Sequence, residues 1–206
     1  MAAGLLLPGC TSSIGDPQIR NCGTIGGNLA SSDPAADLSA VALALEATIN
    51  TVGPNCMRAI AADQFFVDSL KTVLKQGEII ISVDFPSHVA GTGSAYYKFK
   101  HPANYYSVCG VAAKIFRSPN GAINKCCVAV TGATDRARRL GVVETILEGK
   151  EVTADNIAAA ALQANEGLTF VWDLYASGEY RAYLTRLLTE KALACAAERG
   201  GFRSRL

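Results

Sequence analysis

Two adjacent glycines, Gly26 and Gly27, lie in the segment TIGGN (residues 24–28) and carry the clearest chemical signal in this sequence. Because glycine has no Cβ, two successive backbone N–H groups can approach a ligand closely. Successive N–H groups of this kind form a concave site for an anion. The segment is therefore predicted to bind phosphate, although glycine pairs also occur in turns that bind nothing. It is neither GxxxxGK[ST] nor GxGxxG, and both patterns are absent from the chain.

A helix is predicted directly after this segment. Asp33 followed by Pro34 is typical of an N-cap with proline at the first helical position. The partial positive charge at such a helix start favours a pyrophosphate group nearby. Asp37 lies one turn into the helix, where its carboxylate can accept hydrogen bonds from ligand hydroxyls or simply interact with the helix dipole. One apolar face is predicted for this helix, made by Leu38, Val41 and Leu45.

The chain is predicted to divide near residue 90, into domains 1–90 and 91–206. There PSHVAGTGS collects proline, glycine and serine between two extended stretches. EIIISVDF (residues 78–85) predicts a buried strand before the break. Three further strands are predicted after it, and Asn120 and Gly121 would supply the positive φ angles of the turn between the last two. These strands are SAYYKF (94–99), YSVCGVAAKIFR (106–117) and KCCVAVTGA (125–133).

The remaining segments are predicted to be helical, and the first begins around residues 135–149. The second, residues 153–165, would be capped by Thr153 and ended by Gly167. The third, residues 177–200, would begin at Ser177 and close at Gly200 and Gly201, with one apolar stripe made by Tyr180, Leu184, Leu187, Leu188 and Cys195. The second half is therefore expected to be α+β, a small antiparallel sheet covered by helices on one face.

Composition narrows the classes of function. The 206 residues suffice for one ordinary domain or two small ones. Lys and Arg number 19 and Asp and Glu 18, so no basic footprint for nucleic acid is present. No window reaches the ~18 apolar residues of a membrane span, which favours a cytoplasmic protein. MAAGLLLPGC ends an apolar run in cysteine as a lipoprotein signal does, but no basic residue precedes Arg20.

Seven cysteines are scattered along the chain, at positions 10, 22, 56, 109, 126, 127 and 195. The count is odd, and no CxxC pair is present. Zinc or an iron–sulfur cluster would need clustered thiolates at short fixed spacings. The cysteines are therefore predicted to be buried small hydrophobic residues, and no metal is predicted in this chain.

The whole motif, IGDPQIRNCGTIGGNLASSDPAADLSAVALALEA, resembles the second glycine motif of the flavin-binding medium subunit of molybdenum hydroxylases. That family includes aerobic carbon monoxide dehydrogenase and xanthine dehydrogenase. The resemblance continues through GEIIISVDFP, AYYKFKHPANYYSVCGVAAKIF, CCVAVTGATDRARR and DLYASGEYRAYLTRLLTEKAL, and so covers nearly the whole chain past residue 13.

The resemblance implies that FAD lies between a two-lobed α/β domain and a C-terminal α+β domain with a three-stranded antiparallel sheet and a helical bundle. The implied cofactor-binding residues are Thr24, Ile25, Gly26, Gly27 and Asn28 around the pyrophosphate, with Asp37, Ile80, Lys98 and Tyr106 as further contacts. Tyr106 would shield the flavin ring, or else simply pack at a strand start. Lys98 would contact the cofactor, or else be a solvated strand lysine.

The implied role is that of an oxidoreductase subunit, inactive alone, with no catalytic acid, base or nucleophile of its own. In the family a large subunit holds a molybdenum cofactor, and a small subunit carries two [2Fe–2S] clusters. Electrons pass from those clusters to FAD and on to an external acceptor. The alternative interpretation is a truncated scaffold subunit of the same complex that holds no flavin.

One departure from the family lies at the start, because the lobe with the first glycine-rich loop is missing upstream. Losing two charge-assisted hydrogen bonds, each worth roughly 1.5 to 3 kcal/mol, would weaken FAD binding about a hundredfold or more. We therefore expect either that this lobe is encoded separately or that the chain binds FAD poorly.

Overall fold

The computed structural model describes residues 6–118 and 121–201. Four helices come first and are followed by a three-stranded antiparallel sheet of order β2-β1-β5. The helices are α1 (Leu6–Ser13), α2 (Pro17–Cys22), α3 (Ile25–Ser31) and α4 (Asp37–Leu45), and the strands are β1 (Thr48–Val52), β2 (Met57–Ala61) and β5 (Ile79–Asp84). A 3-10 turn, η1 (Ala62–Gln64), and a small hairpin of β3 (Phe66–Asp68) and β4 (Lys71–Thr72) lie between β2 and β5.

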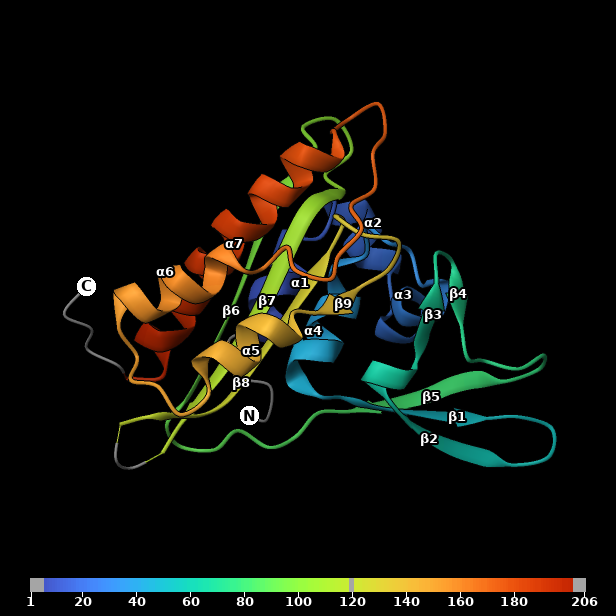
Figure 1. Ribbon diagram of the computed structural model, residues 1–206. Helices are drawn as coiled ribbons and strands as arrows, with labels where there is room; N and C mark the ends of the chain where they lie inside the picture. The colour runs from blue at the N-terminus through green and yellow to red at the C-terminus, as the bar shows by residue number, and fades with distance from the viewer. Residues whose placement is uncertain (1–5, 119–120, 202–206) are drawn as a thin grey trace.

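A second antiparallel sheet, of order β6-β7-β8-β9, forms the centre of the molecule (Figure 1). Its strands are β6 (Thr92–Lys100), β7 (Ser107–Arg117), β8 (Ile123–Thr131) and β9 (Arg138–Arg139), and the helices that follow are α5 (Gly141–Leu147), α6 (Ala154–Leu162) and α7 (Gly178–Arg199). The α+β class and the three long strands are confirmed. The two-residue strand β9 extends the predicted three-stranded sheet, and α5 is correspondingly shorter than residues 135–149.

The helices of the second half, α5–α7, cover one face of this sheet as predicted, and a helix from the first half covers the other face. Helix α7 packs along β6 and β7, while α4, from the first half of the chain, packs on β7 and β8 (Figure 1). Neighbouring residues of a strand point to opposite faces. Val111 and Val128 accordingly belong to the core beneath α5–α7, and Ala112 and Ala129 to the core beneath α4. Small alanine side chains let α4 lie close to the sheet, which joins the two halves of the chain.

Helix α4 was predicted to have a single apolar face, and this prediction is wrong. All nine of its residues are buried. It lies between α1, α3 and the sheet strands β7 and β8. A helix that is surrounded by other elements needs no polar face, and the sequence DLSAVALAL supplies only small and apolar side chains after its first residue, apart from Ser39.

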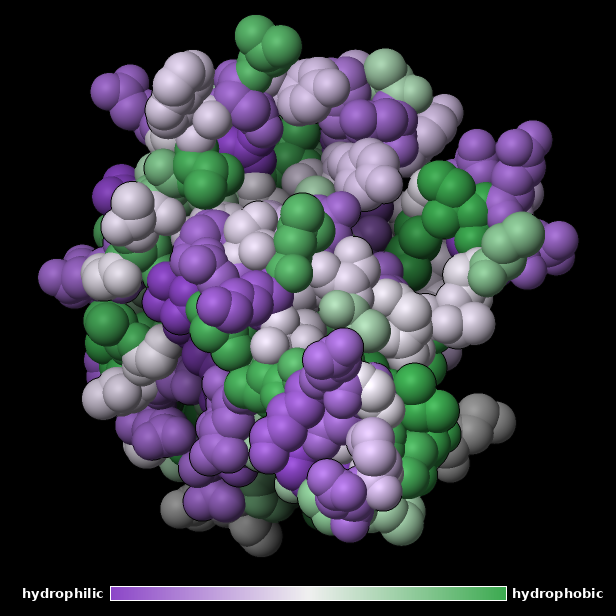
Figure 2. Space-filling view, turned by 90° about the vertical axis from the view of Figure 1, so that its right-hand side faces the viewer, coloured by the Kyte–Doolittle hydropathy of each residue, from purple (hydrophilic) through white to green (hydrophobic). Residues whose placement is uncertain are grey.

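The strand predicted at residues 78–85 forms as β5, but it is not buried. Ile79 and Ile81 are both exposed, because alternate residues of β5 point to opposite faces and α3 covers the face of Ile80. Figure 2 shows that hydrophobic side chains on this side of the molecule are scattered among hydrophilic ones. A run of β-branched residues predicted the strand correctly and its burial incorrectly.

Two helix starts are confirmed in detail. The hydroxyl of Thr153 accepts from the amide of Asn156 at 3.2 Å, and that of Ser177 accepts from the amide of Tyr180 at 3.2 Å. Helix α6 ends at Leu162, before the expected Gly167. In α7, Leu184 and Leu188 are buried as predicted, whereas Tyr180 is exposed and Leu187 and Cys195 are only half-buried.

The predicted glycines at chain reversals adopt the expected angles. Gly200 ends α7, and Gly201 follows with φ +79°. Gly121 has φ +94°, as the turn prediction requires. Asn120, the other residue of that prediction, lies outside the described residues.

Within residues 6–118 and 121–201, no helix is long and apolar enough to cross a membrane. The same residues contain no group of three or more His, Cys, Asp or Glu side chains arranged to hold a metal ion.

The cysteines are predicted to separate into two classes when a thiol reagent is added. Cys10, Cys109, Cys126 and Cys127 are buried, whereas Cys22 and Cys56 are exposed, contrary to the expectation that all seven are buried. Burial raises the pKa of Cys109 to about 12, so its reactive thiolate is scarce at pH 8. We expect iodoacetamide to label Cys22 and Cys56 in the folded protein and the four buried thiols only after denaturation, as read by peptide mass spectrometry. Labelling of Cys109 before Cys22 would contradict the described packing.

Candidate functional site

The glycine pair lies in the first turn of α3, not in a turn before a helix. Thr24 is the N-cap of α3, and its hydroxyl accepts from the amide of Gly27 at 3.0 Å. The amide of Asn28 donates to the carbonyl oxygen of Thr24, also at 3.0 Å. Neither glycine has a positive φ. Two of the amides expected to bind phosphate are therefore occupied by Thr24.

Glycine in an ordinary helical conformation destabilises the helix by roughly 0.5–1 kcal/mol relative to alanine. The backbone angles do not require glycine at these two positions. The remaining reason for glycine is the room that a side chain would otherwise occupy. A Cβ at Gly26 would lie 3.7 Å from the Cβ of Ile80, in ordinary contact with β5. Gly27 is exposed and lines a cavity. A Cβ at Gly27 would lie 3.0 Å from the Thr24 hydroxyl, so the glycine leaves room for this cap as well as for a group in the cavity.

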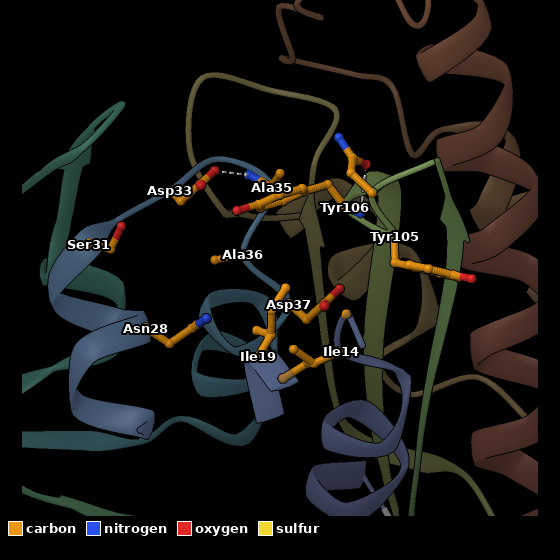
Figure 3. Close-up of a pocket in the computed structure, with 12 residues that line it drawn as sticks. Ile14, Ile19, Asn28, Ser31, Asp33, Ala35, Ala36, Asp37, Tyr105 and Tyr106 are labelled. Atoms are coloured by element: carbon orange, nitrogen blue, oxygen red, sulfur yellow. Dashed lines mark hydrogen bonds between the residues drawn. The ribbon is translucent and has the colours of Figure 1, made fainter. Parts of the chain in front are cut away.

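That cavity, named here the α3 pocket, has a volume of about 550 Å³ and lies between α1, α2 and α3. Its lining includes Thr24, Ile25, Gly27 and Asn28. A neighbouring cavity of about 180 Å³, the Asp37 pocket, lies between α3 and the start of α4 (Figure 3). The two pockets share three lining residues, Ile14, Ile19 and Asn28. They therefore adjoin and form one groove.

Asn28 projects into this groove from α3 (Figure 3). Its side-chain oxygen Oδ1 is buried and has no hydrogen-bond partner in the part of the chain that the structure describes. A buried polar atom without a partner is unfavourable by about 1–3 kcal/mol. The side-chain nitrogen of Asn28, which donates hydrogen bonds, is the atom that projects into the groove (Figure 3), so the groove fits a ligand with an acceptor oxygen at this position.

The start of α4 differs from the prediction. Helix α4 begins at Asp37, with Ala36 at the N-cap position and no side-chain cap. Asp33 instead accepts from the amide of Ala35 at 2.8 Å and stabilises the turn that precedes the helix. Asp37 is thus the first residue of the helix, where a negative charge is favoured by the helix dipole.

The Asp37 carboxylate is the most heavily bonded group of the site. Its Oδ2 accepts from the ammonium of Lys98 at 2.8 Å. Its Oδ1 accepts from the hydroxyl of Ser107 at 2.5 Å and from the hydroxyl of Tyr96. The side chains of Lys98 and Asp37 are only 4% and 6% exposed, so the interpretation of Lys98 as a solvated lysine is wrong. A carboxylate has about four acceptor positions, which leaves about one for a ligand in the Asp37 pocket.

The surroundings of Asp37 keep its neighbours protonated. Burial, followed by the negative charge of Asp37, raises the pKa of Tyr96 well above its ordinary value. The same two causes raise the pKa of the Cys10 thiol. Tyr96 therefore remains a hydrogen-bond donor to the carboxylate throughout the physiological pH range.

Tyr106 covers the Asp37 pocket. Its side chain extends across the pocket toward the turn at Asp33 and Ala35, whereas that of Tyr105 points away (Figure 3). Tyr106 is 50% exposed and directly precedes β7, so its role in shielding a flavin ring stays a prediction. Ile80 packs beside Gly26 and lines neither pocket. Of the predicted site residues, six line the groove: Thr24, Ile25, Gly27, Asn28, Asp37 and Tyr106. Lys98 joins the site through its ion pair with Asp37, whereas Gly26 and Ile80 face each other between α3 and β5 and line neither pocket.

Sequence reasoning missed Tyr96, Ser107 and Tyr105. Tyr96 and Lys98 are two positions apart on β6, with one residue between them, so they share a face of the strand. That spacing is the signal by which Tyr96 could have been found. Ser107 begins β7 and offers no comparable signal in the sequence.

Two families match successive parts of the chain. The family described as the FAD binding domain in molybdopterin dehydrogenase matches residues 5–88. The family described as the CO dehydrogenase flavoprotein C-terminal domain matches residues 94–196.

Curated relatives align along almost the whole chain. The 6-hydroxypseudooxynicotine dehydrogenase complex subunit alpha of Paenarthrobacter nicotinovorans is 34% identical over 90% of this chain and 63% of its own length. The carbon monoxide dehydrogenase medium chain of Hydrogenophaga pseudoflava is 31% identical over 93% of this chain and 66% of its own. The chain thus spans slightly less than two thirds of the length of these relatives.

Solved structures show the same fold. Carbon monoxide dehydrogenase from Hydrogenophaga pseudoflava, in a form lacking the Mo-pyranopterin moiety, superposes with a TM-score of 0.91 at 33% identity. The match covers 96% of this chain and 69% of that one. Quinoline 2-oxidoreductase from Pseudomonas putida 86 superposes with a TM-score of 0.85 at 25% identity, over 95% of this chain and 67% of that one.

Proposed function

Because this chain belongs to the family of FAD-binding medium subunits of molybdenum hydroxylases, we propose that it holds FAD in the groove formed by the α3 pocket and the Asp37 pocket. The observation that carries the proposal is the placement of Gly27. This glycine lines the groove in the first turn of α3, beside Asn28, and leaves that part of the pocket wall without a side chain.

The residues divide the binding task by position. Thr24 to Asn28 line or flank the α3 pocket, where the pyrophosphate would approach the chain most closely at Gly27. Asp37 and Tyr106 line the Asp37 pocket, where the carboxylate accepts hydrogen bonds and the tyrosine ring excludes water from one side. Lys98 holds the Asp37 carboxylate in place through the buried ion pair. FAD itself supplies the redox chemistry when bound.

Electron relay is the role proposed for the loaded subunit. It would receive electrons from [2Fe–2S] clusters of a partner small subunit, while a molybdenum-containing large subunit oxidises the substrate. The loop after α6 supports the presence of partner chains, because it exposes 81% of Trp172 and 100% of Leu174. Large apolar side chains exposed together are typical of protein interfaces. The subunit is accordingly proposed to be inactive without its partners.

Replacing Gly27 by alanine is expected to weaken FAD binding at least tenfold while leaving stability within about 1 kcal/mol of the wild type. The added Cβ would intrude into the groove and lie 3.0 Å from the Thr24 hydroxyl, whereas alanine is the better helix former. FAD affinity is measured by flavin fluorescence on the purified chain, and stability by urea denaturation.

The matched control is Ala30→Gly, an exposed position on the same helix outside both pockets. It should lower stability by roughly 0.5–1 kcal/mol and leave FAD affinity unchanged. A chain that binds no FAD but copurifies with its partner subunits would instead support the flavin-free scaffold.

A further inference from the structure

Among the described residues, β6 pairs with β7 alone, so the central sheet has a free edge at β6 (Figure 1). In an antiparallel pair, successive residues direct their N–H and C=O groups alternately toward the partner strand and away from it. Directly before β6, the carbonyl oxygen of Gly91 accepts from the amide of Arg117 of β7, and directly after it the amide of His101 donates to Tyr106. The odd-numbered residues of β6 therefore face β7, and the even-numbered residues face the free edge.

The first part of this edge is closed by other segments of the chain. The amide of Thr92 donates to the carbonyl oxygen of Val89 at 3.1 Å. The carbonyl oxygen of Thr92 lies 3.1 Å from Nε2 of His88. The carbonyl oxygen of Ser94 accepts from the guanidinium of Arg199, also at 3.1 Å. A further strand is therefore excluded from β6 as far as Ser94.

The rest of the edge, residues 96–100, is open. The outward backbone groups of Tyr96, Lys98 and Lys100 have no hydrogen-bond partner within residues 6–118 and 121–201. Five residues of a strand span about 17 Å. A row of unpaired N–H and C=O groups of this kind is a template for pairing with another chain. The open edge therefore has room for one short added strand.

A cavity of about 510 Å³, named here the β6 groove, lies along the open edge. Its lining includes residues 96–98 and Lys100 on one side, and residues from the connection between α1 and α2 on the other. Tyr105, whose side chain points away from the Asp37 pocket, also lines it (Figure 3). The groove thus offers an extended chain a second wall opposite β6.

Lysine on an edge strand often prevents pairing with other chains, because its free charge resists burial. Neither lysine of the open edge projects freely. Lys98 forms the buried ion pair with Asp37, and the ammonium of Lys100 lies 4.6 Å from the centroid of the Tyr105 ring. Both side chains are held by the protein itself, so the backbone between them stays accessible to a partner.

The charge of the β6 groove favours an acidic occupant. Arg20 and Lys100 line the groove, against a single carboxylate, that of Asp16. The third lining cation, Lys98, is balanced by Asp37. One positive charge therefore remains, and an acidic chain is attracted to it whereas a basic chain is repelled.

The two faces of the open edge favour different side chains. Lys98 and Lys100 share one face of β6, whereas Tyr97 and Phe99 share the other and are 39% and 42% exposed. Opposite charges, and aromatic with β-branched residues, are favourable cross-strand pairs. The matching strand therefore alternates acidic and β-branched residues.

We propose that the β6 groove binds an extended acidic segment of a partner polypeptide, which joins the central sheet as a strand antiparallel to β6. Acidic residues of the segment lie opposite Lys98 and Lys100, and β-branched residues lie opposite Tyr97 and Phe99. Main-chain hydrogen bonds supply affinity in such pairing, and the alternating side chains supply specificity. Flavin is not required for it, so the inference stands apart from the proposed function.

The test follows the fluorescence anisotropy of a labelled pentapeptide, Glu-Val-Glu-Val-Glu, during titration with the purified full chain. We expect a dissociation constant below about 1 mM, and at least tenfold weaker binding of Lys-Val-Lys-Val-Lys. Methylating the glutamate backbone nitrogens removes the donors that face β6 and should abolish binding. Methylating the valine nitrogens, which face away from β6, should leave the affinity unchanged and is the matched control.

Variants of the chain test the same edge. Lys100→Pro removes one outward N–H, and proline is tolerated on an edge strand at such a position. It should weaken binding of the acidic peptide at least tenfold, with an unchanged circular dichroism spectrum. Lys100→Ala keeps the N–H and should weaken binding by only about threefold, as expected for an exposed charge. Lys71→Ala, an exposed lysine of β4 outside the groove, should have no effect.

Four outcomes would overturn the proposal. The first is no binding of the acidic peptide at about 1 mM chain, and the second is equal binding of the acidic and basic peptides. The third is equal affinity of the two methylated peptides, or of Lys100→Pro and Lys100→Ala, since backbone pairing would then be absent. The fourth is displacement of the peptide by saturating FAD, which would assign the β6 groove to the flavin.

Discussion

Replacing Asp37 by alanine is expected to lower the free energy of unfolding by about 3–5 kcal/mol, because it leaves the Lys98 ammonium buried without its counter-ion. The hydroxyls of Tyr96 and Ser107 lose their common acceptor at the same time. Urea denaturation followed by circular dichroism measures the change. Lys98→Met should also be destabilising, since it leaves the carboxylate unpaired.

The double variant Asp37→Ala with Lys98→Met separates the ion pair from general damage. Once one charge is gone, removing the other should relieve an unpaired buried charge, so the double variant should be less destabilised than the sum of the single variants. The matched control is Lys125→Met, which breaks the more exposed pair with Glu46 and should change stability by less than about 1 kcal/mol. Equal effects of Asp37→Ala and Lys125→Met would mean that the Asp37–Lys98 pair is not buried in solution.

Gly93→Ala is expected to destabilise the protein by about 3 kcal/mol, because α7 crosses β6 with no room for a side chain. A Cβ at Gly93 would overlap backbone atoms of α7, namely the carbonyl oxygen of Ala196 and the amide nitrogen of Gly200. Backbone atoms of a packed helix cannot move aside as a flexible side chain can. The helix must therefore shift away from the sheet, which thermal or urea denaturation detects as a lower free energy of unfolding.

Gly9→Ala is the control for this change. Gly9 lies inside α1, and a Cβ there would meet no atom within 4 Å. Alanine should therefore stabilise α1 by roughly 0.5–1 kcal/mol. If Gly93→Ala were as harmless as Gly9→Ala, the close contact between α7 and β6 would not exist in solution.

Features that depend on a few neighbouring residues were predictable from the sequence. The caps at Thr153 and Ser177 were found because a hydroxyl three residues before a backbone amide needs nothing else to bond it. The long strands were found because β-branched and apolar runs suit an extended backbone. The family resemblance, carried by TIGGN and its spacing to the PAADL segment, indicated the residues that line the groove proposed to hold FAD.

Features that depend on distant segments were not predictable in the same way. Asp37 and Lys98 are 61 residues apart, and only the packing of α4 on the central sheet brings them together. The same packing buries α4 on all sides and places the Asp37 carboxylate, which was predicted to accept hydrogen bonds from ligand hydroxyls, in an ion pair with Lys98. The hydroxyls of Tyr96 and Ser107 donate to the same carboxylate. The local sequence pattern by itself determined the helices and strands, the glycine segment and the residue types of the site. Tertiary structure alone decided which of those side chains pair with each other, because burial and charge pairing are set by neighbours that the sequence places far away.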